Sequence, residues 1–252
     1  MAITESKEFL EKGEIIFELN APARHIYVLE KGEIGVQYGD NPLVEVGSIL
    51  EGESFGESAL LIGGRRSATA RCETEVTIRS YDADQIKALF KKWTDGKLMC
   101  QCLLIEMINA NEYQRTRSLE AQADEHRSVV LTDLVSNAIR SFSTFEQIVR
   151  SPEQIHDGWE RKEAFLITSG HAVIRKGKHL VEIGADTCLG ASQLILSEKP
   201  VNSFEIESIK QPLAGWFVPV SKSYEKLKQL NVGLAAVARG IAHKTLRSGG
   251  LV

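Results

Sequence analysis

Residues 55–70 (FGESALLIGGRRSATA) bring an acid, a guanidinium group and several small residues together in one short stretch. Gly56 has no Cβ, so its backbone can lie directly against a ligand. If the residues after Gly56 open a helical turn, their free amides attract an anion. Arg66 follows in the same stretch, and its planar guanidinium group can bind a phosphate through paired donors. The stretch therefore suits a phosphate group.

Glu57 has a different task, because a carboxylate repels a phosphate. A carboxylate accepts hydrogen bonds from hydroxyl groups, such as those of a ribose. The alternative interpretation is a surface turn with an incidental Glu–Arg pair, which contributes only ~0–1 kcal/mol and does not explain the surrounding small residues. We favour a site for a phosphate that is joined to a sugar.

The composition limits the other classes of function. The chain has 252 residues, enough for one large or two ordinary domains, and a formal net charge of −4 without a basic tail. This charge disfavours nucleic acid as a partner. The sequence has no apolar run of membrane-spanning length, and its N-terminus is too polar for a signal peptide. We therefore expect a cytoplasmic protein without a membrane partner.

Metal binding and catalysis are also not expected. The cysteines lack the spacing of zinc ligands and are interpreted as reduced thiols in or near the core, and the histidines lack metal-ligand spacing as well. The sequence has no nucleophile-elbow pattern. We expect no prosthetic group, no bound metal, no catalytic residue and no enzymatic activity.

The spacing of apolar residues predicts strands followed by helices. Residues 13–82 read as many short strands separated by turns, which favours a barrel or sandwich. From Asp82 the apolar period changes, and it predicts a short helix over 82–93, a long helix from Asp95 and another helix over 129–149. A final helix is expected from Ser221, and its apolar stripe is either a face for a partner helix or, as we favour, packs back onto the second barrel.

The second half of the sequence repeats the first. Three blocks match in the same order: YVLEKGEIGV with FLITSGHAVI, LVEVG with LVEIG, and FGESALLI with LGASQLIL. The pattern predicts a duplicated β domain. In the second copy of the 55–70 stretch, Ala191 stands where the first copy has Glu57, and Pro200 stands where it has Arg66. The second copy therefore lacks both charged groups.

Residues 55–70 resemble the phosphate-binding cassette of the cyclic nucleotide-binding domain, the module of catabolite-activator proteins, protein kinase A regulatory subunits and nucleotide-gated channels. The cassette reads Phe-Gly-Glu-x-Ala-Leu, a variable loop and Pro-Arg-x-Ala-Thr, and it is matched here by Phe55, Gly56, Glu57, Ala59, Leu60, Arg66, Ala68 and Thr69. The resemblance covers residues 9 to about 128. It implies a mainly β fold with two double-stranded β-helix (jelly-roll-like) barrels, each flanked by α-helices, in domains 1–128 and 129–252.

The resemblance also implies roles for individual residues. Glu57 would bind the ribose 2′-hydroxyl and Arg66 the cyclic phosphate. The residues expected around them are Val36 and Val46 in the barrel wall, Phe55, Gly56, Ser58, Ser67 and Ala68 in the cassette, and Asn109 and Asn111 at the base edge. The two asparagines are equally well interpreted as solvated helix residues.

Two positions depart from the family pattern. Arg65 stands where proline is common, and its side chain either competes for the phosphate or, as we favour, faces solvent. Asn20 stands where a turn glycine is usual. Neither departure removes a ligand contact.

The resemblance implies a receptor for cAMP or cGMP that signals by a conformational change to an unidentified effector protein. The tail after Tyr224 supplies no helix-turn-helix, so direct operator binding is disfavoured. The second barrel is expected to be a degenerate copy that binds no nucleotide. The alternatives are a scaffold protein that uses both barrels as docking surfaces and an atypical transcriptional regulator.

The long helix, residues 97–128, has a family role in pairing two chains. The resemblance thus implies a homodimer through a seam of Leu98, Cys102 and Ile105. The alternative is that the second barrel covers this seam within one chain.

Overall fold

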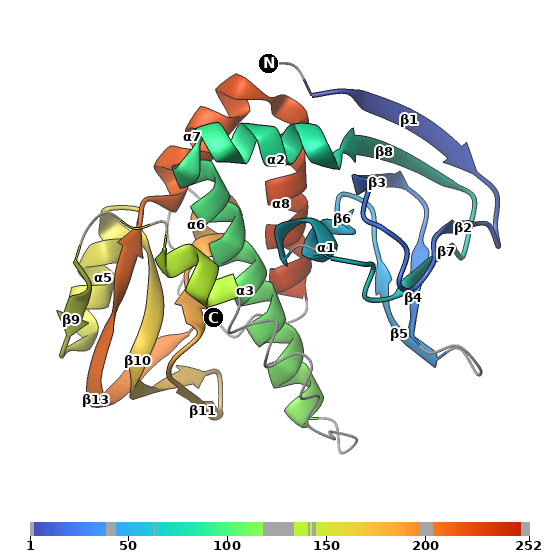
Figure 1. Cartoon of the computed structure of the whole chain (residues 1–252). Coiled ribbons are helices and arrows are strands. Elements are labelled where there is room, and N and C mark those ends of the chain that lie inside the picture. The colour runs from blue at the N-terminus through green and yellow to red at the C-terminus, as the bar shows by residue number, and fades with distance from the viewer. Residues whose placement is uncertain are drawn as a thin grey trace. The chain divides into compact units, whose positions relative to one another are not determined.

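The computed structural model describes residues 3–38, 44–62, 64–117, 134–140, 142, 145–196 and 204–247; within these ranges the side chains of 44–46, 60–62 and 111–117 are not described. The chain forms two compact units, each built from separate stretches (Figure 1). The first unit is Met1–Trp93 with Leu227–Lys244, and the second is Thr94–Lys226 with Thr245–Val252. The expected domain boundary at residue 128 falls outside the described residues and stays a prediction.

The first unit contains two antiparallel sheets, in the orders β1-β8-β3-β6 and β2-β7-β4-β5. Residues of both sheets, among them Leu29, Ile34 and Ile78, form one buried apolar cluster between them. The strands are β1 (Glu5–Leu10), β2 (Ile15–Phe17), β3 (His25–Lys31), β4 (Ile34–Tyr38), β5 (Val44–Ile49), β6 (Ser54–Phe55), β7 (Thr69–Cys72) and β8 (Val76–Asp82).

The sheets are not closed in the part of the chain that the structure describes. In the described residues, each sheet of the first unit ends in two unpaired edges, at β1 and β6 and at β2 and β5. Among the described residues, the two sheets share one apolar core but are not joined by a strand ladder. The antiparallel β character is confirmed, whereas two tandem jelly-roll-like barrels stay a prediction.

Two helices follow the strands of the first unit, α1 (Glu57–Ile62) and α2 (Ala83–Lys92). Asp82 caps α2 by accepting a hydrogen bond from the Gln85 amide at 2.8 Å. Ile86 and Phe90 are buried, as the apolar spacing predicted. The helix expected over 82–93 is therefore confirmed.

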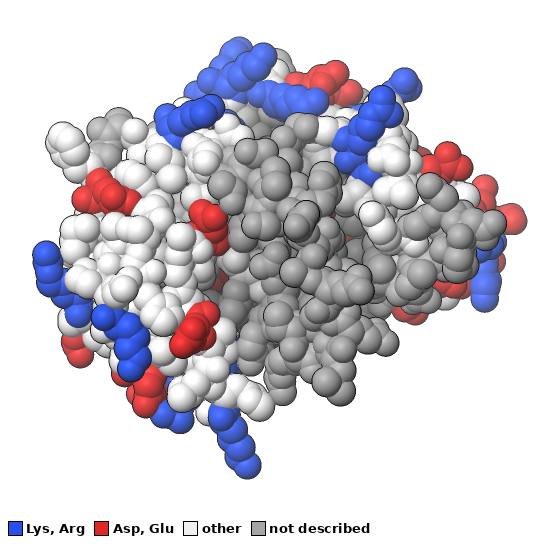
Figure 2. Space-filling view, turned by 60° about the horizontal axis from the view of Figure 1, so that its bottom comes forward, with Lys and Arg blue, Asp and Glu red and all other residues white. Residues whose placement is uncertain are grey.

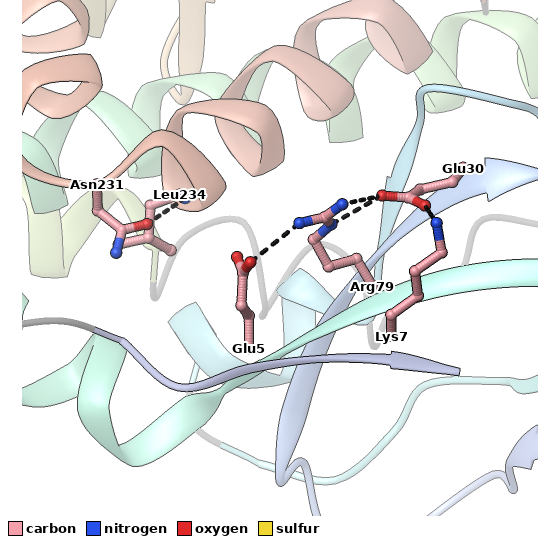
Figure 3. A network of polar contacts seen from close by, with 6 residues as sticks. All are labelled: Glu5, Lys7, Glu30, Arg79, Asn231 and Leu234. Carbon is pink, nitrogen blue, oxygen red and sulfur yellow. Dashed lines mark hydrogen bonds and ion pairs between the residues drawn. The ribbon is translucent and has the colours of Figure 1, made fainter.

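A group of charged side chains joins the strands β1, β8 and β3 (Figure 3). Arg79 binds Glu30 through Nε at 2.8 Å and Glu5 through Nη1 at 3.0 Å, and Lys7 lies 2.8 Å from Glu30. Hydrogen bonds from Lys7 and Arg79 lower the pKa of Glu30. These pairs are partly exposed, so their contribution to stability is small.

The C-terminal region forms two helices instead of the expected one, α7 (Val220–Leu230) and α8 (Val232–Arg247). The break lies at Asn231, whose Oδ1 accepts a hydrogen bond from the Leu234 amide at 2.8 Å (Figure 3). This is an N-cap interaction, which favours the start of a new helix over the continuation of the old one.

The apolar stripe of α8 belongs to the first unit, because Leu227–Lys244 is part of that unit. Leu234, Val237 and Ile241 are buried. The expectation that this stripe packs onto the second half of the chain was wrong. The apolar spacing of α8 does not indicate whether the helix packs against the first or the second unit.

The second unit has one antiparallel sheet in the order β11-β10-β13-β9, with β12 also paired to β10. Its strands are β9 (Gln147–Val149), β10 (Ala164–Lys176), β11 (His179–Ile183), β12 (Thr187–Leu189) and β13 (Glu205–Val218), and its helices include α3 (Thr94–Arg117), α5 (Pro152–Glu160) and α6 (Ala191–Leu196). An apolar cluster that includes Trp159, Phe165 and Leu213 forms the core.

The helix expected over 129–149 is only partly present. Residues 134–139 are helical, but 147–149 form strand β9, in which Val149 pairs with Leu213 of β13. Ile148 and Val149 are β-branched, which suits an edge strand, and the available sheet edge outweighs their helical spacing. Part of this range, including 129–133, lies outside the described residues.

Helix α3 carries the expected dimer seam, and Leu98, Cys102 and Ile105 are buried within the single chain. Inside the second unit α3 packs against β12 and α6. This burial agrees with the alternative in which the chain covers the seam by itself.

Figure 2 shows acidic and basic side chains interspersed on the described part of one face. Within the ranges that the structure describes, no group of three or more candidate metal ligands occurs. None of the described helices combines the length and apolar character that crossing a membrane requires.

Candidate functional site

The turn between β6 and α1 is built around Gly56. Its φ is +79°, in the left-handed region that side chains rarely adopt. A Cβ at this position would lie 2.4 Å from Nη1 of Arg66. The glycine thus serves two purposes: it allows the turn, and it leaves room for the guanidinium group beside the backbone.

Arg66 is a buried cation with an exposed fraction of 3%. Its Nη1 donates to the Gly56 carbonyl and its Nη2 to the His25 carbonyl, each at 2.7 Å. Its Nε has no hydrogen-bond partner in the described residues. Burial lowers the pKa of Arg66, while the neighbouring Tyr27 and Glu57 partly offset this effect.

Three aromatic rings hold the guanidinium group in place. The ring centroids of Phe17 and Tyr27 lie 5.8 Å apart, and those of Tyr27 and Phe55 lie 5.0 Å apart, all three rings being stacked. The Arg66 guanidinium carbon lies 4.1 Å from the centroid of Phe17. This is a cation–π contact, which partly replaces the water that the buried cation has lost.

Glu57 begins α1 and is 1% exposed. Its Oε1 accepts a hydrogen bond from Nζ of Lys244 at 2.8 Å, while its Oε2 has no hydrogen-bond partner among the described residues. Lys244 lies on α8, and it also donates to the Ser54 carbonyl at 3.2 Å. All of these residues belong to the first unit.

Lys244 did not figure among the candidate residues of the sequence analysis. It lies three residues after Ile241, where the apolar stripe of α8 would continue. A cation on the apolar face of a helix is the signal that identifies it, because such a residue needs a buried acid as partner.

The other cassette residues lie around the same turn. Phe55 is buried in the aromatic group, Ser58 is half-buried on α1, Ser67 is exposed and Ala68 is half-buried. Their roles toward a ligand stay predictions.

The barrel-wall residues lie on neighbouring strands. Val36, on β4, is partly buried against the core cluster. Val46 lies on β5, and its side chain is outside the described residues.

The two departures from the family pattern contact each other. Arg65 is exposed, as expected, and its Nη1 donates to the Asn20 carbonyl at 2.8 Å. Asn20 adopts a φ of +65°. Asparagine tolerates this conformation better than most residues, so it can take the place of a turn glycine.

The two asparagines of the long helix were candidates for the base edge. In the second unit, Asn109 is buried and donates from Nδ2 to the Asp186 carbonyl at 3.1 Å. The side chain of Asn111 is outside the described residues. Recognition of a base by either residue stays a prediction.

The second copy of the cassette turn, at Gly190, has a different occupant. Gly190 has a φ of +88° and precedes α6, which starts at Ala191. Glu106 of α3 accepts hydrogen bonds from the amides of Gly190 at 3.0 Å and of Ser192 at 2.6 Å. A carboxylate from the same chain therefore lies where the turn presents its amides.

Glu106 is fully buried, and this burial raises its pKa to about 7, although the amide hydrogen bonds act in the opposite direction. Glu106 is not among the residues predicted from the sequence. Its signal is the single charged residue in the run 98–108, in which only Gln101 is otherwise polar. Pro200, the counterpart of Arg66, lies outside the described residues.

Residues 7–92 match the family model of the cyclic nucleotide-binding domain. This match contains the complete cassette with Glu57 and Arg66. The recognition of the family from residues 55–70 is confirmed for this segment. The match does not extend to a second copy.

A curated relative is cGMP-dependent 3′,5′-cGMP phosphodiesterase A of Dictyostelium discoideum, which is 23% identical over 197 residues. The similarity covers 78% of this chain but 22% of the relative, so the chain spans about a fifth of that protein's length.

Similar solved structures include the CBD2 domain of PKAR with bound Sp-2Cl-cAMPS, at 25% identity and a TM-score of 0.31, which covers 35% of this chain and 58% of that chain. Another is a cyclic nucleotide-binding-like protein of Brucella abortus, at 20% identity and a TM-score of 0.32, which covers 34% of this chain and 76% of that chain.

Proposed function

We propose that the first unit is a receptor for a cyclic nucleotide, cAMP or cGMP. The observation that carries this proposal is the pair of buried, oppositely charged side chains at the Gly56 turn. Glu57 and Arg66 each keep one polar atom without a hydrogen-bond partner in the described residues, Oε2 and Nε respectively. Buried polar groups are normally satisfied, so unsatisfied ones at a turn of this kind point to a ligand.

The chemistry of the two groups matches a cyclic nucleotide. The carboxylate of Glu57 accepts hydrogen bonds, as a ribose hydroxyl requires, and the guanidinium group of Arg66 donates to a phosphate. Arg66 donates hydrogen bonds to the backbone carbonyls of Gly56 and His25, which are weaker acceptors than a charged phosphate. A phosphate can therefore displace them. We assign Ser58, Ser67 and the close backbone at Ala68 to the same phosphate site.

The choice between the two purines is part of the test. One relative is by its name cGMP-dependent, and one similar structure contains an analogue of cAMP. The cassette residues named here recognise the ribose and the phosphate, which both nucleotides share. We include both messengers in every measurement.

We further propose that the protein acts without catalysis in the cytoplasm and signals to a partner protein. In this proposal the second unit is a degenerate copy of the first. Gly56 and Gly190 have similar positive φ angles, and each precedes a helix of six residues. The carboxylate of Glu57 has no counterpart at Ala191, and this difference supports a second unit that does not bind nucleotide.

Titration calorimetry with cAMP and with cGMP tests the proposal, with 5′-AMP as a control for an open phosphate. Arg66→Ala should weaken binding by about 30-fold or more, because truncation of one partner of a buried charged contact costs 2–5 kcal/mol. Arg65→Ala is the matched control, since it removes the exposed neighbouring cation, and it should bind as the wild type does.

Equal binding by the two arginine variants would contradict the proposal. The proposal is also contradicted if neither cAMP nor cGMP binds to the wild type or to a variant in which Lys244 is replaced. That result would favour the scaffold interpretation, in which both units serve as docking surfaces.

A further inference from the structure

We propose that α8 closes the nucleotide site, with Lys244 in the place of the ribose. This inference rests on the proposed function and concerns the regulation of the same site. The helix would act as an internal competitor for Glu57. A nucleotide could then bind only when residues 232–244 leave the cassette turn.

The contacts of Lys244 show that it covers Glu57. Its ammonium group donates to Oε1 of Glu57 at 2.8 Å and to the Ser54 carbonyl at 3.2 Å, so it bridges the strand before the turn and the first residue of α1. The side chain of Lys244 is 15% exposed and that of Glu57 is 1% exposed. A ribose hydroxyl cannot reach a carboxylate that is this deeply covered.

The backbone of α8 also lies against the site. A Cβ at Gly240 would be 2.5 Å from the amide nitrogen of Ser54 and 3.0 Å from the carbonyl carbon of Glu53. The helix therefore touches the strand that leads into the cassette turn, one helical turn away from Lys244. Withdrawal of the lysine side chain alone would leave this part of the helix in place.

Lys244 and a ribose would compete for Glu57, and only one of them can bind it at a time. A buried carboxylate is strongly unfavourable without a cation or hydrogen-bond donors. Lys244 supplies them in the closed form, and a ribose would supply hydroxyl donors in the open form. Binding must first break the ion pair and expose the apolar face of α8, so the closed helix lowers the apparent affinity.

The coupling is reciprocal. If α8 weakens nucleotide binding, then the nucleotide must weaken the attachment of α8 by the same factor. A bound nucleotide would thus release residues 232–244 from the first unit. The released helix, with Leu234, Val237 and Ile241 on its apolar face, would be the segment that carries the signal.

Titration of the full chain with cAMP and cGMP tests this inference through Lys244→Met. We expect nucleotide binding to become about tenfold tighter, which corresponds to about 1.4 kcal/mol. We also expect a lower melting temperature without nucleotide, because Glu57 loses its cation. Arg239→Met is the matched control, because Arg239 is exposed on the same helix and its Nε donates a hydrogen bond to His243. It should bind nucleotide as the wild type does.

A second variant and a second measurement guard against a folding defect in Lys244→Met. Gly240→Ala pushes α8 away from Ser54 without altering any charge, and it should also tighten binding. In the wild type, saturation with nucleotide should accelerate hydrogen exchange of the amides in 232–244.

The outcomes separate the two proposals. If the wild type binds and the Lys244 and Gly240 variants bind equally well or more weakly, the internal competitor is refuted while the receptor function stands. Unchanged exchange of 232–244 at saturation has the same meaning. If neither the wild type nor any α8 variant binds, both proposals fail.

Discussion

The turns at Gly56 and Gly190 have similar backbone shapes, but they obtain their charges from different parts of the chain. The φ angles are +79° and +88°, and a helix of six residues follows each glycine. In the first unit the acid, Glu57, belongs to the turn itself, and Arg66 lies against the turn. In the second unit the turn has Ala191, and the acid arrives from α3 as Glu106.

Under the proposed function, this difference explains why only the first turn would bind a ligand. Backbone amides that point into a protein interior need an acceptor. Glu106 is an acceptor that the chain itself supplies to the amides at Gly190, so that turn needs no ligand. At Gly56 a cation lies beside the turn instead, and a cation attracts an anionic ligand. The two turns share a backbone shape. In this interpretation, the position of the nearby charged side chains decides whether the turn makes an internal contact or binds a ligand.

The largest expected effect comes from giving the second turn the acid of the first. Ala191 is fully buried beside the Glu106 carboxylate, so Ala191→Glu adds a like charge without a cation. We expect a loss of about 3–5 kcal/mol in the free energy of unfolding and no nucleotide binding by the second unit. Urea unfolding and calorimetry measure the two effects.

The neutral control for this variant is Ala191→Ser, which should cost much less. A stable Ala191→Glu protein that binds a second nucleotide would show that the two turns differ in that one residue alone. It would contradict the view that the charges around each turn decide whether it binds a ligand.

A smaller effect should follow the pH through Glu106. The pKa of Glu106 is about 7 in the folded protein, above its ordinary value, so the folded state holds a proton that the unfolded state has released between these two values. Stability from this group is therefore full below the ordinary pKa and is lost as the pH rises to about 7. The loss should reach about 3 kcal/mol at most.

Thermal unfolding from pH 4 to pH 8 measures this loss. Glu106→Gln carries no titrating group, so its unfolding should lack this part of the pH dependence. The same curve for wild type and Glu106→Gln would show that another group is responsible.

The smallest expected effects come from replacing Gly56 or Gly190 by alanine. At Gly190 a Cβ would lie 2.7 Å from Nε1 of Trp159, whose ring is fixed in the core, whereas at Gly56 it would lie 2.4 Å from Nη1 of Arg66, the far end of a longer side chain. Gly190→Ala should lower the free energy of unfolding by about 1–3 kcal/mol. Gly56→Ala should unfold closer to wild type, but it should weaken nucleotide binding because it displaces Arg66. Urea unfolding and nucleotide titration of both variants check this, and a reversed order of the two effects would contradict it.

Local features of the sequence predicted much of the first unit. Turn residues and β-branched runs predicted short strands over 13–82, and the change of apolar period at Asp82 predicted α2. Such features act between residues that are close in the chain, so they can be read without a structure. Strand β9 and the break at Asn231 were not predicted. At β9 a helix competes with pairing at a sheet edge, and at Asn231 the N-cap of a new helix competes with continuation of the old one.

The sequence by itself determined the cassette, since Gly56, Glu57 and Arg66 lie within one short segment and their types define the chemistry. Only the tertiary structure decided what covers those residues. Lys244 reaches Glu57 across 187 positions, and Glu106 reaches Gly190 across 84. A contact over such separations depends on which surfaces α8 and α3 bury, and many apolar stripes suit more than one surface. For this reason a single lysine or glutamate in an apolar helix is visible in the sequence, whereas its partner is set by the fold.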